Sequence, residues 1–293
     1  MEKVIKIENL PSPYSIFLLM INKTRFENIL SQPKVKVTLD NLIISKEWVN
    51  RYNIFFNLLQ ENKVPITFPF LATMPLQLKL FSITETMINP LGFLHISNYM
   101  KKFKEIPLEK SLSSEVLLKR VELVKKGVEI CVEITILSQG EILWQCESKY
   151  LKFSNKYRCK EETIEKSRIP TLPIDNPNRE ITFTVTSRDA KNYASLSKDY
   201  NPIHISKLFA KLMKLPSPII HGMWTVGKTL QHLSYSQAEN VYFYHIFKGP
   251  IPIGSTGKIL VQPIDNGEKV EVYIEGNPKP CLQGLISATE IEN

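Results

Sequence analysis

The segment Gly222–Leu233 reads GMWTVGKTLQHL and is mostly apolar over the length of a helix. Four runs with strand-like composition follow it, at Val241–Lys248, Lys258–Gln262, Val270–Glu275 and Leu282–Glu290. In the third run, valine and isoleucine alternate with charged and aromatic residues, which is typical of a strand with one buried face. A helix this apolar must bury most of its surface against other elements of the protein. The sequence therefore predicts an antiparallel sheet that wraps around one buried helix.

The residues before this segment predict the elements that lead into it. They are a strand at Ile181–Thr186, a short helix capped by Ser187 that runs through Tyr193, a turn at Asp199–Pro202 and a helical stretch at Ile205–Met213. Serine is a favoured residue at the start of a helix because its hydroxyl can accept a hydrogen bond from a free backbone N–H.

The N-terminal half repeats this order of signals more loosely. It contains a strand at Val35–Ile44, a helix at Glu47–Leu59, a long apolar segment at Phe68–Leu80, and strands at Gly92–Tyr99, Ser114–Val124, Val128–Leu137 and Glu141–Tyr150. Equivalent signals recur roughly 140 to 150 residues apart, which indicates an internal repeat. The expected fold class is α+β, with two copies of a long apolar helix wrapped by an antiparallel sheet.

The two halves are separated by a stretch with the composition of a linker. Residues 153–178 mix both charge signs, contain Pro170, Pro173 and Pro177, and show no apolar period. A chain of 293 residues allows two domains of about 150 residues each. The expected organisation is an N-terminal domain at 1–152, a linker at 153–178 and a C-terminal domain at 179–293.

Composition narrows the classes of function. Lysine and arginine number 37 against 29 acidic residues, a net charge of +8 that suits phosphate-bearing or acidic ligands. No zinc finger, aromatic RNA-binding motif or dense basic tract occurs, so nucleic acid is not an expected partner. The apolar run Ile16–Ile21 is too short to span a membrane, and no secretory signal is evident. Four scattered cysteines suggest reduced thiols in a cytoplasmic protein.

The hexapeptide at Asp199–His204, DYNPIH, carries the strongest chemical signal. The Asn201-Pro202 pair favours a turn, and a proline holds the residue before it extended. Asp199 and His204 should then lie on either side of a tight bend, where a carboxylate and an imidazole can act as a general acid/base pair. A simple turn with a histidine near a helix start explains the same residues about as well.

A second motif, His221-Gly222-Met223, opens the apolar segment 17 residues after His204. A glycine at a helix start lets a ligand approach the backbone closely, and the free N–H groups there can stabilise an oxyanion. The alternative is that Gly222 only permits tight packing. His221 could shape the site or make a structural hydrogen bond. No histidine has metal-ligand spacing with a second ligand, so we expect no metal.

The run Tyr193–Gly227 resembles the MaoC-like (R)-specific enoyl-thioester hydratases and 3-hydroxyacyl-thioester dehydratases. The matching residues are Tyr193, Ser197, Asp199, Asn201, Pro202, Ile203, His204, Ala210 and His221-Gly222-Met223. One departure is Lys198, which stands where the family signature usually has glycine. The resemblance implies that Asp199 and His204 are catalytic, and that Gly222, Asn201 and His221 contribute to the oxyanion or substrate site.

The first half is similar to the N-terminal half of two-domain members of the same family, at residues 65–76 and 89–98. This implies a double hotdog fold. The stretch expected to match DYNPIH lies near Gln60–Ile66 and lacks the motif, and no histidine precedes His95. We therefore expect a degenerate N-terminal hotdog without the dyad and one active site per chain.

The resemblance implies a hydro-lyase of fatty acid metabolism that interconverts trans-2-enoyl and (3R)-3-hydroxyacyl thioesters. Coenzyme A or an acyl carrier protein would carry the substrate, with no other cofactor. A hotdog thioesterase or a non-catalytic acyl-thioester-binding subunit are the alternatives. Two hotdogs in one chain are compatible with a monomer, as an internal pseudo-dimer, or with a homodimer.

Overall fold

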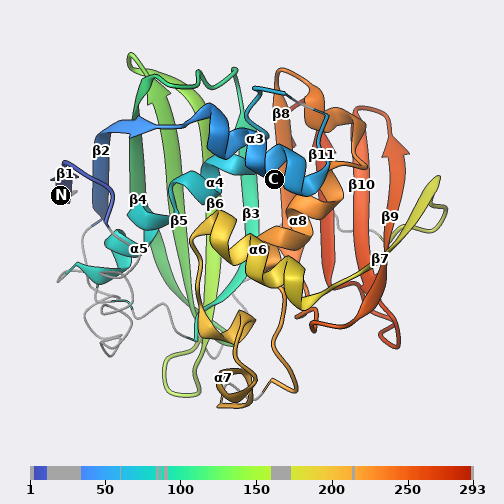
Figure 1. Cartoon of the computed structure of the whole chain (residues 1–293). Helices are drawn as coiled ribbons and strands as arrows, with labels where there is room; N and C mark the ends of the chain where they lie inside the picture. The colour runs from blue at the N-terminus through green and yellow to red at the C-terminus, as the bar shows by residue number, and fades with distance from the viewer. Residues whose placement is uncertain are drawn as a thin grey trace. The chain divides into compact units, whose positions relative to one another are not determined.

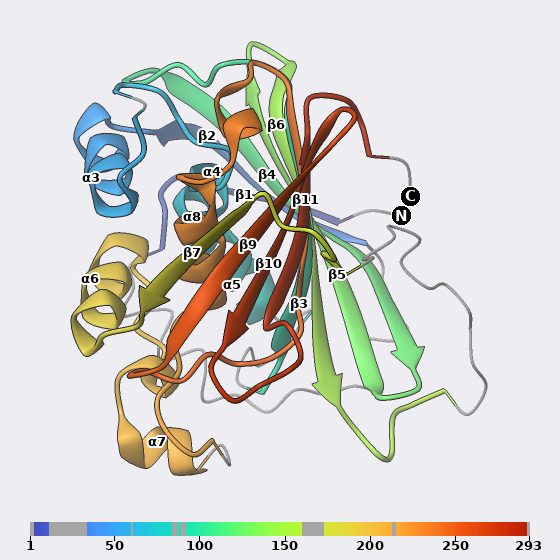
Figure 2. The same ribbon diagram turned by 90° about the vertical axis from the view of Figure 1, so that its right-hand side faces the viewer.

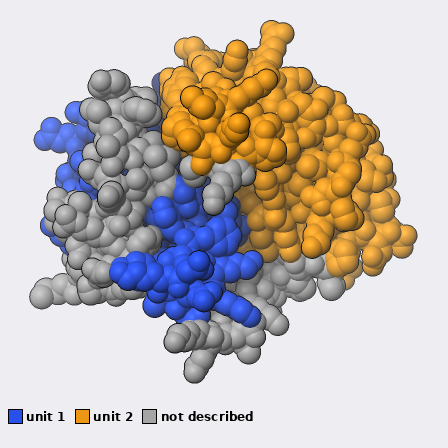
Figure 3. Space-filling model, turned by 90° about the horizontal axis from the view of Figure 1, so that it is seen from below, with its two compact units in different colours: residues 1–45, 69–168 blue, residues 46–68, 169–293 orange. Residues whose placement is uncertain are grey.

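The computed structural model describes residues 3–11, 34–59, 61–83, 86, 88, 92–159, 173–212 and 215–291. The chain divides into two compact units, which are coloured separately in Figure 3. Unit 1 comprises residues 1–45 and 69–168, and unit 2 comprises residues 46–68 and 169–293. Residues 46–68 thus belong to the same unit as the C-terminal half. The expected boundaries at 152 and 179 stay a prediction about the sequence repeats.

The sheet of unit 1 contains six strands. They are β1 (Lys3–Ile7), β2 (Val35–Ile43), β3 (Leu94–Lys102), β4 (Ser111–Val124), β5 (Gly127–Ser138) and β6 (Glu141–Phe153). They pair in the order β1-β2-β4-β5-β6-β3, antiparallel except for the parallel pair β1–β2. The sequence correctly predicted five of these strands. The short strand β1, whose residues are partly or fully exposed, was not predicted.

The apolar segment Phe68–Leu80 forms two helices instead of one, α4 (Phe68–Ala72) and α5 (Met74–Ser82). Thr73 separates them, and its hydroxyl donates to the carbonyl of Pro69. Pro75 lies in the first turn of α5. Proline has no backbone N–H and is accommodated best at a helix start. The prediction of a single long segment was therefore wrong at this point. Helix α5 packs against β2 and β4.

Unit 2 contains a five-stranded antiparallel sheet and most of the helices. The strands are β7 (Arg179–Thr184), β8 (Val241–Phe247), β9 (Thr256–Ile264), β10 (Gly267–Ile274) and β11 (Leu282–Ser287), in the order β8-β11-β10-β9-β7. The helices are α3 (Lys46–Phe56), α6 (Ser187–Ser197), α7 (Lys207–Leu212) and α8 (Gly222–Leu230), with 3-10 turns η1 (Pro202–His204) and η2 (Ser234–Gln237). Figure 1 labels the helices and strands.

Helix α8 is the central helix of unit 2, as its apolar sequence predicts. Seven of its residues are buried. In Figure 2 it lies between the strands of the unit and the outer helices α3 and α6. Helix α3 packs on both α6 and α8. At the contact with α8, a Cβ on Gly227 would lie 2.5 Å from a ring atom of Phe56, so only glycine fits there.

Helix α6 begins one residue earlier than a Ser187 cap would require, and it extends to Ser197 instead of Tyr193. Thr186 is the N-cap, and its hydroxyl accepts from the backbone N–H of Asp189. The Asp189 carboxylate in turn accepts from the Thr186 N–H, which completes a capping box. The prediction of Ser187 as the cap was wrong because the reciprocal partner lies three residues after Thr186.

The two units share local details that identify them as repeats. After the central helix, Thr86 donates its hydroxyl to the carbonyls of Leu80 and Ile83, and Ser236 donates to those of Leu230 and Leu233. Gly127 opens β5 and Gly267 opens β10, and a Cβ on either would collide with a carbonyl of the paired strand. Each unit therefore has the hotdog arrangement of a helix covered by an antiparallel sheet.

Candidate active site

The left-handed residue Lys198 ends α6 and sets the position of Asp199. Lys198 has φ 62° and ψ 12° at the C-cap, a conformation that glycine adopts most easily. The hydroxyl of Ser197 accepts from the Asp199 N–H at 3.3 Å and donates to the carbonyl of Tyr193. The departure from the family pattern thus leaves a glycine-like backbone in place. Lys198 adopts it at a cost of about 1 kcal/mol.

The tight bend after Asp199 has the geometry that the Asn-Pro pair predicts. The Asn201 N–H donates to Asp199 Oδ1 at 3.1 Å, and Asn201 Oδ1 accepts from the Ile203 N–H at 3.3 Å. The turn η1 then carries the chain through His204. Asn201 therefore holds the carboxylate through its backbone and caps the turn through its side chain.

His204 is buried and held in one tautomer. Its Nδ1 lies 2.8 Å from the carbonyl oxygen of Ile219, which can only accept, so Nδ1 carries the proton. In the neutral ring Nε2 is then an acceptor. Burial lowers the pKa of His204 below 6.5, although the Asp199 charge acts in the opposite direction. At neutral pH the residue is a neutral base.

His221 stacks on His204, with ring centroids 3.7 Å apart and an interplanar angle of 27°. Its Nε2 donates to the backbone carbonyl of Asp199 at 3.0 Å and lies 3.9 Å from Asp199 Oδ2. Burial, and then the nearby His204, lower the pKa of His221 to about 4. Its Nδ1 is buried and has no hydrogen-bond partner among the described residues. The neutral ring of His221 thus connects the start of α8 with the turn before η1.

Gly222 is the exposed first residue of α8, between buried His221 and Met223. No acceptor for its N–H is found among the residues that the structure describes. A Cβ here would lie 2.9 Å from the ring of Phe247, so the packing explanation for this glycine also holds. Both roles are compatible, because an exposed N–H at a helix start can bind an anionic oxygen.

A metal ion is the chemical alternative for this cluster. Asp199, His204 and His221 place donor atoms within 4.8 Å of one another, the one such group of three within the described ranges. Backbone carbonyls already occupy one nitrogen of each ring. The stacked rings keep their remaining lone pairs in nearly parallel planes, whereas metal ligands must converge at about 2.0–2.1 Å. The donor set is a poor fit, and the absence of a metal stays a prediction.

Helix α3 supports the site from a part of the sequence that offered no signal for this role. Trp48 Nε1 donates to the carbonyl of Leu196 at 2.9 Å, next to the end of α6. Phe56 packs on Tyr193 with ring centroids 6.0 Å apart, and Tyr193 packs on His221 at 5.0 Å. A continuous row of rings thus links α3 to the histidine pair.

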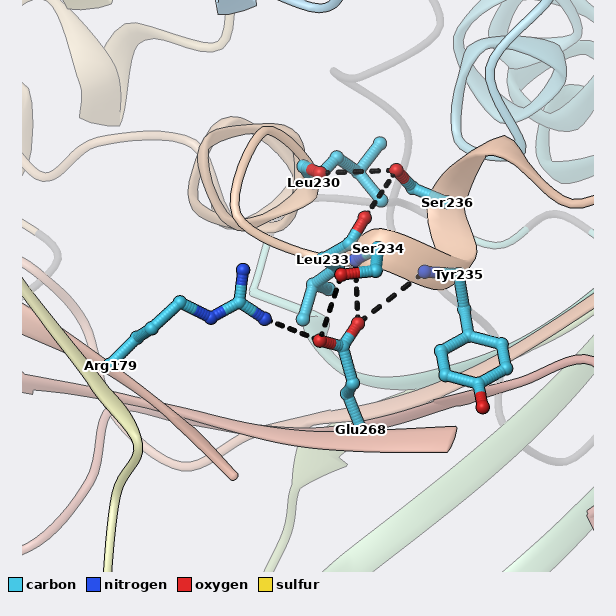
Figure 4. Close-up of polar contacts among 7 residues, drawn as sticks. All are labelled: Arg179, Leu230, Leu233, Ser234, Tyr235, Ser236 and Glu268. Atoms are coloured by element: carbon cyan, nitrogen blue, oxygen red, sulfur yellow. Dashed lines mark hydrogen bonds and ion pairs between the residues drawn. The ribbon is translucent and has the colours of Figure 1, made fainter. Parts of the chain in front are cut away.

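The other end of α8 is fixed by a buried carboxylate on β10 (Figure 4). Glu268 accepts from the backbone N–H groups of Ser234 and Tyr235 at 2.6 and 3.4 Å, and pairs with Arg179 on β7. Ser236 donates to the last turn of the helix at Leu230. No sequence pattern singles out Glu268, since one carboxylate in an alternating strand carries no signal of its partner.

Comparison with known proteins agrees with this site. A family model described as a MaoC like domain matches residues 169–276, which include every residue of the cluster. The C-terminal part of the chain is therefore a MaoC-like domain. Among curated proteins, a 3-hydroxyacyl-thioester dehydratase X of Mycobacterium tuberculosis is 23% identical over 80% of this chain and 82% of the relative. The peroxisomal enoyl-CoA hydratase 2 of Arabidopsis thaliana is 27% identical over 47% of this chain and 48% of its own length.

A solved structure has the same fold over most of the chain. The crystal structure of HtdX from Mycobacterium tuberculosis superposes with a TM-score of 0.72 at 20% identity, over 86% of this chain and 98% of the other. The expected double hotdog fold is thereby confirmed. No helix in the described part of the chain has the length and apolar character needed to cross a membrane.

Proposed function

We propose that this MaoC-like protein is a hydro-lyase that interconverts trans-2-enoyl and (3R)-3-hydroxyacyl thioesters. The observation that carries the proposal is the pairing of Asp199 with a neutral, tautomer-fixed His204 beside the exposed start of α8. Its relatives named as a 3-hydroxyacyl-thioester dehydratase and an enoyl-CoA hydratase 2 support the same reaction.

The Gly222 N–H is the proposed donor to the thioester carbonyl. Negative charge develops on that oxygen as water adds to Cβ, and a preorganised N–H stabilises it most when water is excluded. The start of α8 adds its partial positive charge to the same point. A substrate anchored there would bring its Cα and Cβ toward the Asp199–His204 pair.

His204 is the proposed base in the hydration direction. Its Nε2 accepts one proton from the water while the water oxygen bonds to Cβ, and the pair then delivers a proton to Cα. The net result places OH on Cβ and H on Cα and restores both side chains. In dehydration the pair removes the Cα proton and protonates the leaving hydroxyl group. Asp199, held by the Asn201 N–H, orients the water and shares the proton.

The reaction adds or removes water, so we propose that it needs no redox cofactor. The substrate would reach the protein as a thioester of coenzyme A or of an acyl carrier protein. Cys131, Cys146, Cys159 and Cys281 are all free thiols, which supports a reducing compartment such as the cytoplasm.

Incubation with crotonyl-CoA tests the proposal against its alternatives. Loss of the enoyl absorbance without release of thiol, and formation of the (3R)-alcohol, would support hydration. Release of free thiol would identify a thioesterase, and binding without turnover would identify a non-catalytic subunit.

Two variants test the assignment of the site. Asp199→Asn and His204→Ala should each lower the hydration rate by about 10²- to 10⁴-fold, with an unchanged circular dichroism spectrum. Near-native rates in both variants would contradict the proposed roles.

A further inference from the structure

Helix α7, which directly follows the catalytic turn, exposes its large apolar side chains. Leu208 is 73% exposed and Leu212 is 69% exposed, one helical turn apart. Ile205, between η1 and α7, is 44% exposed. In Figures 1 and 2, α7 projects from unit 2 away from α6 and α8. Isolated exposed leucines are common, but a cluster of three beside a candidate active site indicates an interaction surface.

The same segment is positively charged. Lys207 and Lys211 are exposed on α7, one helical turn apart, and exposed Lys198 precedes the catalytic aspartate. Within the described residues, none of the three has a carboxylate within 4.0 Å. The described charges of residues 197–212 are these lysines and Asp199, which accepts from the Asn201 N–H. The surface therefore attracts an acidic partner.

The α7 surface, defined as Ile205, Lys207, Leu208, Lys211 and Leu212, is firmly joined to the catalytic turn. The N–H groups of Ile205 and Ser206 both donate to the carbonyl of Pro202 in η1. Ser206 caps the helix by accepting from the Phe209 N–H at 3.3 Å. The buried Ala210 anchors the opposite side of the helix. A partner bound here would lie at a fixed position relative to His204.

We propose that the α7 surface docks an acyl carrier protein that delivers the enoyl thioester to the Asp199–His204 pair. This inference rests on the proposed function. An acyl carrier protein is acidic and carries its acyl group on a flexible arm, so it needs a basic and apolar surface beside the active site. Binding of coenzyme A alone would not explain the exposure of Leu208 and Leu212. A second copy of this chain would bring lysines against lysines, and a six-residue helix is too short to form a stable membrane-binding face.

Kinetics with two carriers of the same acyl group test the proposal. The double variant Leu208→Asn/Leu212→Asn should raise KM for crotonyl-acyl carrier protein by about tenfold or more. The double variant Lys207→Glu/Lys211→Glu should do the same and should remove most of the salt dependence of kcat/KM. For crotonyl-CoA, the leucine variant should keep kcat/KM within about twofold of the wild type, and the lysine variant should keep kcat within about twofold, since neither touches the reacting atoms.

Matched controls come from other exposed residues of unit 2. Ile54 is 79% exposed and Leu59 is 87% exposed, so Ile54→Asn/Leu59→Asn removes similar apolar surface at another place. Lys191→Glu reverses an exposed charge on α6. These variants should leave turnover of both substrates unchanged.

Three outcomes would overturn the docking proposal. In the first, the α7 variants change the kinetics with both substrates equally or with neither. In the second, α7 mediates binding to phosphatidylserine vesicles and not to the carrier protein. In the third, the protein is a dimer that the α7 variants dissociate. A failure of the proposed function is distinguishable, because the wild type would then hydrate neither substrate. Titration with holo-acyl carrier protein, followed by calorimetry, would still report docking at α7 in that case.

Discussion

Both units contain histidines whose pKa is lowered, but they use them differently. In unit 1, His95 lies between the rings of Phe70 and Tyr150, with centroids 5.4 and 4.6 Å away. Its Nε2 is 2.7 Å from Asn98 Oδ1, and burial lowers its pKa to about 4. In unit 2, His204 and His221 meet a partly exposed carboxylate beside an exposed glycine. Burial alone makes a histidine neutral. A carboxylate and an open helix start make it useful for proton transfer.

The sheet register shows that His95 has an equivalent in unit 2. His95 pairs with Tyr150 of β6, and His245 pairs with Gly284 of β11. The repeated strands place both histidines at the same position of their sheets. Tyr150 stacks on His95, whereas His245 is fully buried and contacts the rings of Phe243 and Phe247, with centroids 5.0 and 5.3 Å away. The histidines of the active site lie elsewhere in unit 2, His204 in η1 and His221 at the start of α8.

The largest expected effect separates the two kinds of histidine. His204→Asn should lower kcat/KM for crotonyl-CoA by about 10²- to 10⁴-fold while changing the free energy of unfolding little. His95→Asn should do the reverse, with a loss of about 1–3 kcal/mol of stability and near-native activity per folded molecule. Urea unfolding and initial rates measure both. The comparison fails if His95→Asn lowers activity as much as His204→Asn.

The second effect is a loss of stability at acidic pH, to which one histidine of each unit contributes. The pKa values of His95 and His221 are about 4 in the folded protein and about 6.5 in an unfolded chain. As the pH falls below about 6.5, the unfolded chain binds protons that the folded chain does not, so stability decreases toward pH 4. Each histidine accounts for about 3 kcal/mol.

Unfolding curves between pH 7.5 and 4.5 measure this effect. His95→Phe and His221→Phe should each remove about half of the slope that the two histidines cause. A wild-type stability that does not change over this range would show that neither histidine is neutral because of burial.

The third effect concerns how each unit fixes the end of its central helix. Glu268 follows Gly267 on β10, and the equivalent residue after Gly127 in unit 1 is the buried Val128. Glu268→Val gives unit 2 the residue that unit 1 has at this position, but it leaves the Ser234 and Tyr235 N–H groups without their acceptor. We expect a loss of about 2–3 kcal/mol in the free energy of unfolding. Leu285→Val on the neighbouring strand is a milder control. A neutral effect of Glu268→Val would mean that water replaces the carboxylate.

The smallest effect tests the residue that departs from the family pattern. Lys198→Gly should stabilise the protein by about 1 kcal/mol, because glycine adopts the left-handed conformation without steric cost. Lys198→Ala is the matched variant without that relief. Thermal unfolding measures both. Equal melting temperatures for the two variants would argue that the backbone at the C-cap is not strained.

The sequence predicted the strands well because period-2 alternation reflects burial of one face, as in Val128–Ile136. It predicted helix starts less well, since Ser187 was chosen although Thr186 and Asp189 form the capping pair three residues apart. The break at Thr73 depends on its hydrogen bond to the carbonyl of Pro69. The bend at Asp199–His204 followed from Asn201-Pro202, whose effect is local. The stacking of His221 on His204 depends on the path of the chain between them. No local sequence pattern predicts that path.

The inclusion of residues 46–68 in unit 2 has a consequence for dividing the gene. A fragment that began at residue 179 would keep the whole acid/base cluster but would lose α3, leaving Gly227 and Tyr193 open where Phe56 packs. Such a fragment would expose the apolar surface that Phe56 covers. It would misfold or aggregate unless helix α3 were grafted back or added as a peptide. The C-terminal repeat therefore depends on a helix supplied by the N-terminal half of the chain, so a single cut cannot yield a complete unit 2.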